Sequence, residues 1–173
     1  MESRRQFIVA LTSVCTLGPL ALWLVGPSGT NAMSDESFPI QKSDADWRTT
    51  LTPDRYRILR GHSTERPFTS PLNHEKRSGT FRCAGCGHPL FSSDTKFESG
   101  TGWPSFWRPL AGGVGTQVDR SFLMVRTEVH CARCGGHLGH LFEDGPEPTG
   151  LRYCMNGLAL AFVAGEMGSG VIS

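Results

Sequence analysis

The sequence lacks an excess of charge of either sign. Its 173 residues carry 17 Lys and Arg against 16 Asp and Glu, a formal net charge of +1. A chain with this balance has no basic face for nucleic acid or for anionic lipid, so we expect neither as a partner. It also lacks internal repeats and any sign of a second folded domain, which predicts one domain acting as a monomer.

A second absence is local: residues 6–34 contain no charged side chain. Arg4 and Arg5 precede this apolar run and small residues close it, as in a secretory signal of the twin-arginine type. We expect residues 1–32 to direct export to a bacterial periplasm, with cleavage after Ala32. The alternative is an uncleaved membrane anchor, since the apolar run is just long enough to span a bilayer. We expect a flexible lead-in at residues 33–45 and a flexible tail at residues 164–173.

Glycine and proline are plentiful, with 21 and 11 copies, and they favour a turn-rich, mainly β fold. Two short helices are predicted before the strands begin near Thr80. Ser43 precedes one of them, and Thr52 with Pro53 caps the other, which Gly61 would end. The segment 121–131 alternates as one strand, and Gly157 separates two further strands near the end.

Four of the six cysteines form two C-x-x-C pairs, each followed by glycine. Two thiolates three positions apart can share one metal ion if the backbone turns tightly, and glycine permits that turn. We therefore expect one structural zinc ion with no open coordination position. The alternative is a pair of small disulfide rings, because exported proteins meet an oxidising environment. The expected zinc ligands are Cys83, Cys86, Cys131 and Cys134.

Cys154 stands apart from these pairs, in a strand-like stretch. Alternation places Arg152, Cys154 and Asn156 on one face of the strand and Leu151, Tyr153 and Met155 on the other, which we expect to face the core. A neighbouring cation lowers the pKa of a thiol and favours the nucleophilic thiolate. Cys154 is therefore interpreted as a working thiol; the alternative is an inert, buried cysteine.

Two other stretches offer candidate partners for this thiol. His137 and His140 are free to act as acids, bases or hydrogen-bond partners if four thiolates satisfy the metal; otherwise they are surface histidines of a glycine-rich loop. Trp103, between Gly102 and Pro104, could form an apolar wall for a substrate group. Phe106 is a second candidate substrate contact, although its pattern favours a core aromatic.

Several motifs in fixed order resemble the methionine-R-sulfoxide reductases of the B type. They are CAGCGHPLF, SGTGWPSF, CARCGGHLGHLFEDGPEPTG and RYCMN, and the likeness extends over residues 47–162. The resemblance implies a mainly β domain, residues 46–163, in which two antiparallel sheets pack as a β-tent or sandwich behind short N-terminal helices.

The same resemblance implies roles for the candidate residues. Cys154 would attack the sulfur of a methionine-R-sulfoxide in a protein or peptide, releasing methionine and leaving a sulfenic acid. His137, His140 and Asn156 would protonate the sulfoxide oxygen, Arg152 would favour the thiolate, and Trp103 would pack on the substrate methyl.

The sequence departs from many family members at Thr101, where they carry a resolving cysteine. No unassigned cysteine remains after removal of the signal. We therefore expect an external thiol reductant, such as a thioredoxin-like protein, to reduce Cys154 directly. The competing hypotheses are a zinc-stabilised binding module without catalysis and a thiol–disulfide oxidoreductase that uses one C-x-x-C pair.

Overall fold

The computed structural model describes residues 38–165, and for Phe122 the backbone alone. The predicted signal or anchor (1–32) and all but two residues of the predicted tail fall outside this range. Within it, no helix has the length and apolar character needed to cross a membrane.

Both predicted helices form, and their first residues are capped as expected. Helix α1 (Asp44–Thr50) begins with a capping box in which the Ser43 hydroxyl accepts from the Asp46 amide at 3.1 Å. Helix α2 (Pro53–Leu59) has Thr52 as its N-cap and proline in its first turn. The apolar faces of the two helices bury Trp47, Ile58 and Leu59.

Two residues of the predicted lead-in contact the domain. The Ile40 amide donates to the Arg133 carbonyl at 2.9 Å, and the Phe38 ring contacts His130 edge-on. Residues 41–45, between these contacts and the second turn of α1, are exposed.

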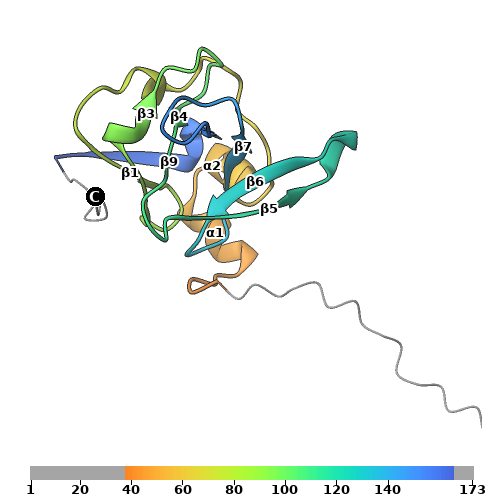
Figure 1. Cartoon of the computed structure of the whole chain (residues 1–173). Coiled ribbons are helices and arrows are strands. Elements are labelled where there is room, and N and C mark those ends of the chain that lie inside the picture. Colours follow the sequence, from red (N-terminus) through yellow and green to blue (C-terminus); the bar gives the residue numbers. More distant parts are fainter. Residues whose placement is uncertain (1–37, 166–173) are drawn as a thin grey trace, which may run out of the picture. The chain divides into compact units, whose positions relative to one another are not determined.

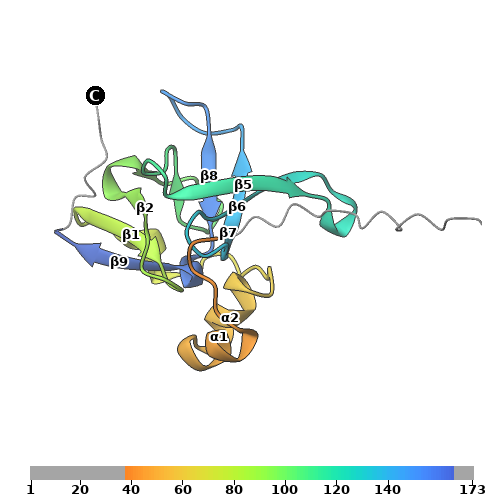
Figure 2. The ribbon, with the colours of Figure 1, turned by 90° about the horizontal axis from the view of Figure 1, so that it is seen from below.

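Two antiparallel sheets make up most of the domain, as the fold prediction required (Figures 1 and 2). The three-stranded sheet has the order β2 (Pro89–Ser92), β1 (Gly79–Cys83), β9 (Leu160–Ala164). The six-stranded sheet has the order β3 (Lys96–Phe97), β4 (Ser105–Phe106), β8 (Arg152–Met155), β7 (His137–Phe142), β6 (Arg126–Cys131), β5 (Val114–Asp119). Short 3-10 helices, η1 (Pro71–His74), η2 (Ser93–Thr95), η3 (Ser121–Leu123) and η4 (Gly157–Ala159), occupy the connections.

Aromatic rings from both sheets meet in the core. Phe106 of β4 stacks on Phe91 of β2, with ring centroids 4.3 Å apart, and meets Phe81 of β1 edge-on at 4.9 Å. All three side chains are fully buried. This cluster joins the sheets and fixes β4 and its neighbour β8, the strand that carries Cys154.

The strand predicted for residues 121–131 is only half correct. Strand β6 begins at Arg126, and the preceding residues form η3 and the turn of the β5–β6 hairpin. Leu123 and Val125, which the alternation placed within the strand, are exposed and lie before it. The hairpin extends beyond the sheets, as Figure 1 shows, so its tip has no core to face.

Candidate active site and metal centre

The two C-x-x-C pairs come together at one place. Cys83 is the last residue of β1 and Cys131 the last residue of β6, and Cys86 and Cys134 lie in the turns that follow. The sulfur atoms of Cys83 and Cys134 lie 3.8 Å apart, and those of Cys86 and Cys131 lie 3.6 Å apart. Four sulfurs at about 2.3 Å from a tetrahedral ion lie about 3.8 Å from one another. The four thiols therefore fit one metal ion of that kind.

Both pairs use the same turn. The amide four residues after the first cysteine donates to that cysteine's carbonyl, from Gly87 at 2.8 Å and from Gly135 at 2.9 Å. Each of these glycines has a positive φ, 73° and 66°, which a side chain would disfavour. None of the four cysteines forms a disulfide bond. The disulfide alternative does not match this arrangement.

Cys154 lies in the interior of the six-stranded sheet, on β8. It pairs with Ser105 on β4 and with His140 on β7, and its sulfur lies 3.8 Å from the Thr101 hydroxyl. It opens into a small cavity of about 130 Å³, whose walls include Trp103, Arg126, His140, Phe142 and Asn156. A cavity well below the usual size for a drug-like ligand suits a single amino-acid side chain. A larger cavity, about 570 Å³, contains none of the predicted site residues.

The environment of the Cys154 thiol contains opposing influences. Burial raises its pKa, and the Thr101 hydrogen bond and the Arg152 charge act against burial without offsetting it. The guanidinium of Arg152 is itself held by Asp144 through two hydrogen bonds of 2.8 Å. Arg152 therefore acts on the thiol in the predicted direction, but the net direction of the pKa is upward because desolvation dominates.

The strand face that carries Cys154 is not solvent-facing. Arg152 and Asn156 are buried, as is Met155 on the opposite face, while Tyr153 is only half-buried. The prediction of one core face and one polar face away from the core was too simple, because β8 has buried side chains on both of its faces.

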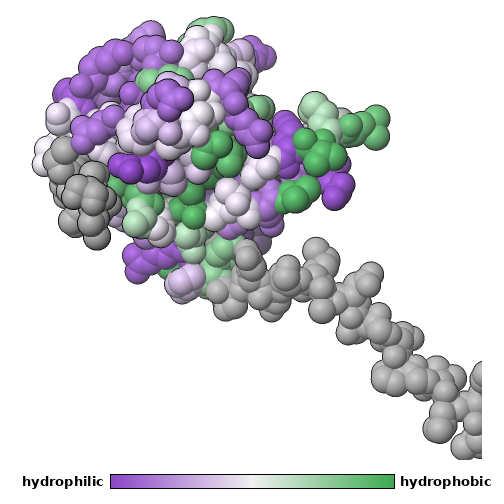
Figure 3. All heavy atoms as spheres, viewed as in Figure 1, coloured by the Kyte–Doolittle hydropathy of each residue, from purple (hydrophilic) through white to green (hydrophobic). Residues whose placement is uncertain are grey.

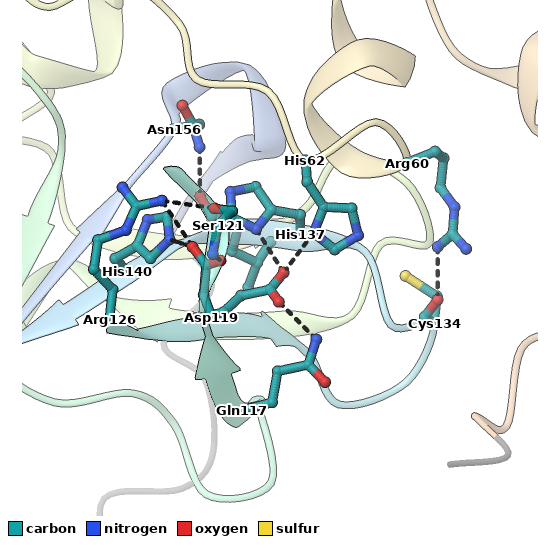
Figure 4. A network of polar contacts seen from close by, with 12 residues as sticks. Arg60, His62, Gln117, Asp119, Ser121, Arg126, Cys134, His137, His140 and Asn156 are labelled. Atoms are coloured by element: carbon teal, nitrogen blue, oxygen red, sulfur yellow. Dashed lines mark hydrogen bonds and ion pairs between the residues drawn. The ribbon is translucent and has the colours of Figure 1, made fainter. Parts of the chain in front are cut away.

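His140 joins a chain of charged groups from the β5–β6 hairpin (Figure 4). Its Nε2 atom lies 2.8 Å from Asp119, which also forms an ion pair with Arg126 at 2.7 Å. Burial lowers the pKa of His140 despite this carboxylate. A neutral ring that donates Nε2–H to Asp119 keeps Nδ1 free as a proton acceptor.

His137 is held by a second carboxylate. Its Nδ1 lies 2.6 Å from Glu128, and the half-exposed His62 approaches the same oxygen at 3.0 Å (Figure 4). Burial alone would raise the pKa of Glu128, but hydrogen bonds from His137, His62 and Gln117 hold it well below its usual range. The carboxylate is therefore ionised, and it fixes the ring of His137, which lies edge-on to His140 with centroids 5.4 Å apart.

Asn156 links the thiol strand to Trp103. Its amide group donates to the Leu138 carbonyl at 3.0 Å and accepts from the Glu65 amide at 3.0 Å. The Glu65 carbonyl in turn accepts from the Trp103 indole at 3.1 Å. The indole is thereby held at the wall of the cavity that Cys154 enters.

Comparisons with known proteins agree with this geometry. A family model described as the SelR domain matches residues 51–164. A peptide methionine sulfoxide reductase MsrB from Agrobacterium fabrum is 58% identical over 132 residues, covering 75% of this chain and 98% of the relative. Proteins of the same name from Methanosarcina mazei and Leptospira interrogans are each 56% identical, over 73% of this chain and 91% and 97% of the relatives. The chain belongs to the B-type methionine-R-sulfoxide reductase family.

Within this family frame, one predicted site residue is wrong. Phe106 is fully buried and stacks on Phe91, so it cannot touch a substrate in the cavity. Its place is in the core between the sheets. Trp103, by contrast, lines the cavity together with Cys154, His140 and Asn156. His137 lines an adjoining cavity with His140.

Sequence reasoning missed the acidic residues that hold the histidines and the arginine. Asp119, Glu128 and Asp144 each contact one of those predicted residues. Glu128 lies on the alternation pattern of β6, but nothing in that pattern tells which histidine it meets. His62, Glu128 and His137 also form a second group whose ligand atoms lie close enough to hold a metal ion. Their hydrogen bonds already satisfy the carboxylate without one.

Proposed function

We propose that this protein reduces the R epimer of methionine sulfoxide in proteins and peptides back to methionine. The observation that carries the proposal is Cys154 itself: a half-buried thiol in a side-chain-sized cavity walled by an indole, an imidazole and an amide. Family membership supports the reaction, and the cavity supplies the groups that the reaction needs. A catalytically inactive, zinc-stabilised binding module would have no need of this constellation.

The opposite character of the cavity walls favours one sulfur epimer. The Trp103 ring offers an apolar surface to the methyl group, and His140 and Asn156 offer polar groups to the sulfoxide oxygen. When the methyl group and the oxygen lie against these two walls, only one configuration of the sulfoxide sulfur places the sulfur within reach of Cys154. The other epimer would place its oxygen against the indole and leave it without a donor.

The site supplies every group that the oxygen transfer needs. Neutral His140 takes the thiol proton, and the Cys154 sulfur attacks the sulfoxide sulfur. The proton then passes to the sulfoxide oxygen as the bond between that oxygen and the methionine sulfur breaks. The oxygen becomes bonded to Cys154 as a sulfenic acid, so the cysteine is oxidised and the sulfoxide is reduced to a thioether. His137 supports His140 from the adjoining cavity.

Regeneration requires a reductant from outside the chain. A threonine, Thr101, lies 3.8 Å from the Cys154 sulfur, and the other four cysteines of the described region form the proposed metal site. A thioredoxin-like dithiol would form a mixed disulfide with Cys154 and release water, and its second thiol would then free the Cys154 thiol.

The cluster of Cys83, Cys86, Cys131 and Cys134 would hold a structural zinc ion. Four thiolates fill its coordination, so the ion would supply folding stability and no position for substrate.

We also propose that the protein is exported by the twin-arginine route to a periplasm and acts there as a monomer. The charge-free N-terminal run behind Arg4 and Arg5 supports this, with an uncleaved membrane anchor as the alternative. Fractionation of native cells and N-terminal sequencing of the mature protein test it. A protein recovered in the cytoplasm with residue 1 intact would contradict export.

The decisive variant for the reaction is Cys154→Ser, assayed on separated R and S epimers of a methionine sulfoxide peptide. We expect wild-type protein to reduce the R epimer only, and the variant to reduce neither while keeping its metal content and its melting temperature. Retained activity in the variant would refute the assignment of Cys154. Cys86→Ser is the contrasting change, since it should alter metal content and stability.

A further inference from the structure

The exposed apolar side chains of the domain are concentrated at one place. Five large apolar residues are exposed among the described residues, and four of them lie on the β5–β6 hairpin: Val118, Leu123, Met124 and Val125. In Figure 3 the green surface of this projecting hairpin stands out beyond the body of the domain. We call these four residues the apolar tip.

Leu123 occupies the end of the apolar tip in an unfavourable backbone conformation. Its φ is 59°, in the left-handed region that glycine or asparagine adopts at lower cost, and its side chain is fully exposed. Folding gains nothing from a bulky apolar residue here. A strained residue that the fold does not require is a reason to look for a binding role.

The turn of the hairpin adjoins the active-site cavity. Asp119 and Arg126 form the last pair of the β5–β6 ladder before the turn and are joined by an ion pair. Arg126 lines the cavity, and Asp119 contacts His140. Arg126 lies three residues from Leu123, so the chain between them spans at most about 10 Å. An extended polypeptide whose methionine sulfoxide enters the cavity can therefore reach the tip with a residue a few positions along its chain.

We propose that the apolar tip binds apolar side chains of the unfolded substrate polypeptide on one side of its oxidised methionine. The inference rests on the proposed reductase function and adds a substrate class: segments whose apolar residues are exposed. Oxidation of methionine disrupts apolar cores, so damaged regions offer such side chains beside the sulfoxide. The tip contributes contact area for them, and the cavity accepts the sulfoxide itself.

The test compares two substrates with dithiothreitol as the only reductant. One is N-acetylmethionine-R-sulfoxide, and the other is a reduced, unfolded protein containing methionine-R-sulfoxide. In Leu123→Asn, which suits the left-handed conformation, the ratio of kcat/KM for the protein to that for the small substrate should fall about tenfold, the effect of losing an apolar contact. Leu123→Phe, which keeps an apolar side chain, should retain the wild-type ratio.

Three results would overturn the proposal. The ratio could be unchanged in Leu123→Asn. The variant could lose activity on both substrates only when a thioredoxin-like protein replaces dithiothreitol, which would make the tip a reductant surface. The ratio could stay unchanged while the wild-type protein sediments with lipid vesicles or self-associates and the Leu123→Asn variant does not. If wild-type protein reduces neither substrate, the reductase function fails first, and that outcome is distinct from a changed ratio.

Discussion

The five described cysteines occupy two contrasting environments. Four of them surround one point, with paired sulfurs 3.6 and 3.8 Å apart and tight glycine turns behind them. Cys154 instead has a hydroxyl, a guanidinium and a cavity as its neighbours. The same side chain could share a metal ion in one region, and in the other we propose that it attacks a substrate.

On the proposed assignment, this difference is what separates a structural thiol from a reactive one. In the cluster each thiol is surrounded by other thiols, and binding a metal satisfies all of them at once. Around Cys154 the neighbours are groups that move or attract protons. Changes in the first region should therefore act on stability, and changes in the second on the rate and its pH dependence.

The largest effect should come from the cluster. Cys131→Ser leaves three thiolates for the ion, and we expect loss of bound metal and of several kcal/mol of stability, a large part of the about 10–16 kcal/mol that structural zinc gives small domains. Metal analysis and thermal unfolding measure both. Cys154→Ser is the matched control, with metal and melting temperature retained. Equal loss of metal in both variants would contradict the separate roles of the four-cysteine cluster and Cys154.

Glu128→Gln should reduce activity without loss of metal. It removes the carboxylate that fixes His137, and we expect kcat/KM to fall roughly 10–100-fold, part of the 10²–10⁴-fold that a positioned acid or base contributes. The pH–rate profile should also change shape. Gln117→Ala, which removes a neutral contact to the same carboxylate, should cost less than about threefold. Similar losses in both variants would argue for a purely structural role.

Arg152→Met should move the pH dependence of the oxygen-transfer step. Burial raises the pKa of Cys154, and Arg152 opposes that rise, so the variant's pKa should lie higher still. Because deprotonated sulfur attacks, single-turnover rates should rise with pH in both proteins, with the variant's inflection displaced to higher pH. At neutral pH the variant's rate should be lower than that of wild type. For Arg152→Lys, which keeps the charge, the inflection should lie between those of wild type and Arg152→Met. If the inflection of Arg152→Met does not move, the charge of Arg152 does not lower the pKa of Cys154.

Thr101→Cys should change the product of the first step more than its rate. The Thr101 hydroxyl lies 3.8 Å from the Cys154 sulfur, so a second thiol there lies within reach of a disulfide. Titration after one turnover should show two thiols lost per sulfoxide in the variant and one in wild type. Thr101→Ser should behave as wild type. If Thr101→Cys loses only one thiol per sulfoxide, the geometry does not allow a disulfide between positions 101 and 154.

Local signals in the sequence determined several features correctly. The caps at Ser43 and Thr52, the glycine turns of the cysteine pairs and the break at Gly157 depend on neighbouring residues, and all of them are present. The two-sheet fold and the four-cysteine cluster followed from motifs and from family resemblance.

The errors concern contacts between distant segments. Alternation cannot show that β8 is covered on both faces or that the hairpin leaves the core before Arg126. Nor can it place Glu128 beside His137, because the register pairs Glu128 with His140 and the contact with His137 is made diagonally by the side chains. Phe106 was a candidate substrate contact because it follows Trp103 in the same motif, although its own pattern favoured the core, where the structure places it.

The most direct test of the central claim is one turnover of wild-type protein with one equivalent of a methionine-R-sulfoxide peptide, followed by a sulfenic-acid trap and peptide mass spectrometry. The account predicts a trapped adduct on Cys154 alone, with Cys83, Cys86, Cys131 and Cys134 still bound to metal. An intramolecular disulfide that includes Cys154, or an adduct on a cluster cysteine with Cys154 unmodified, would contradict it.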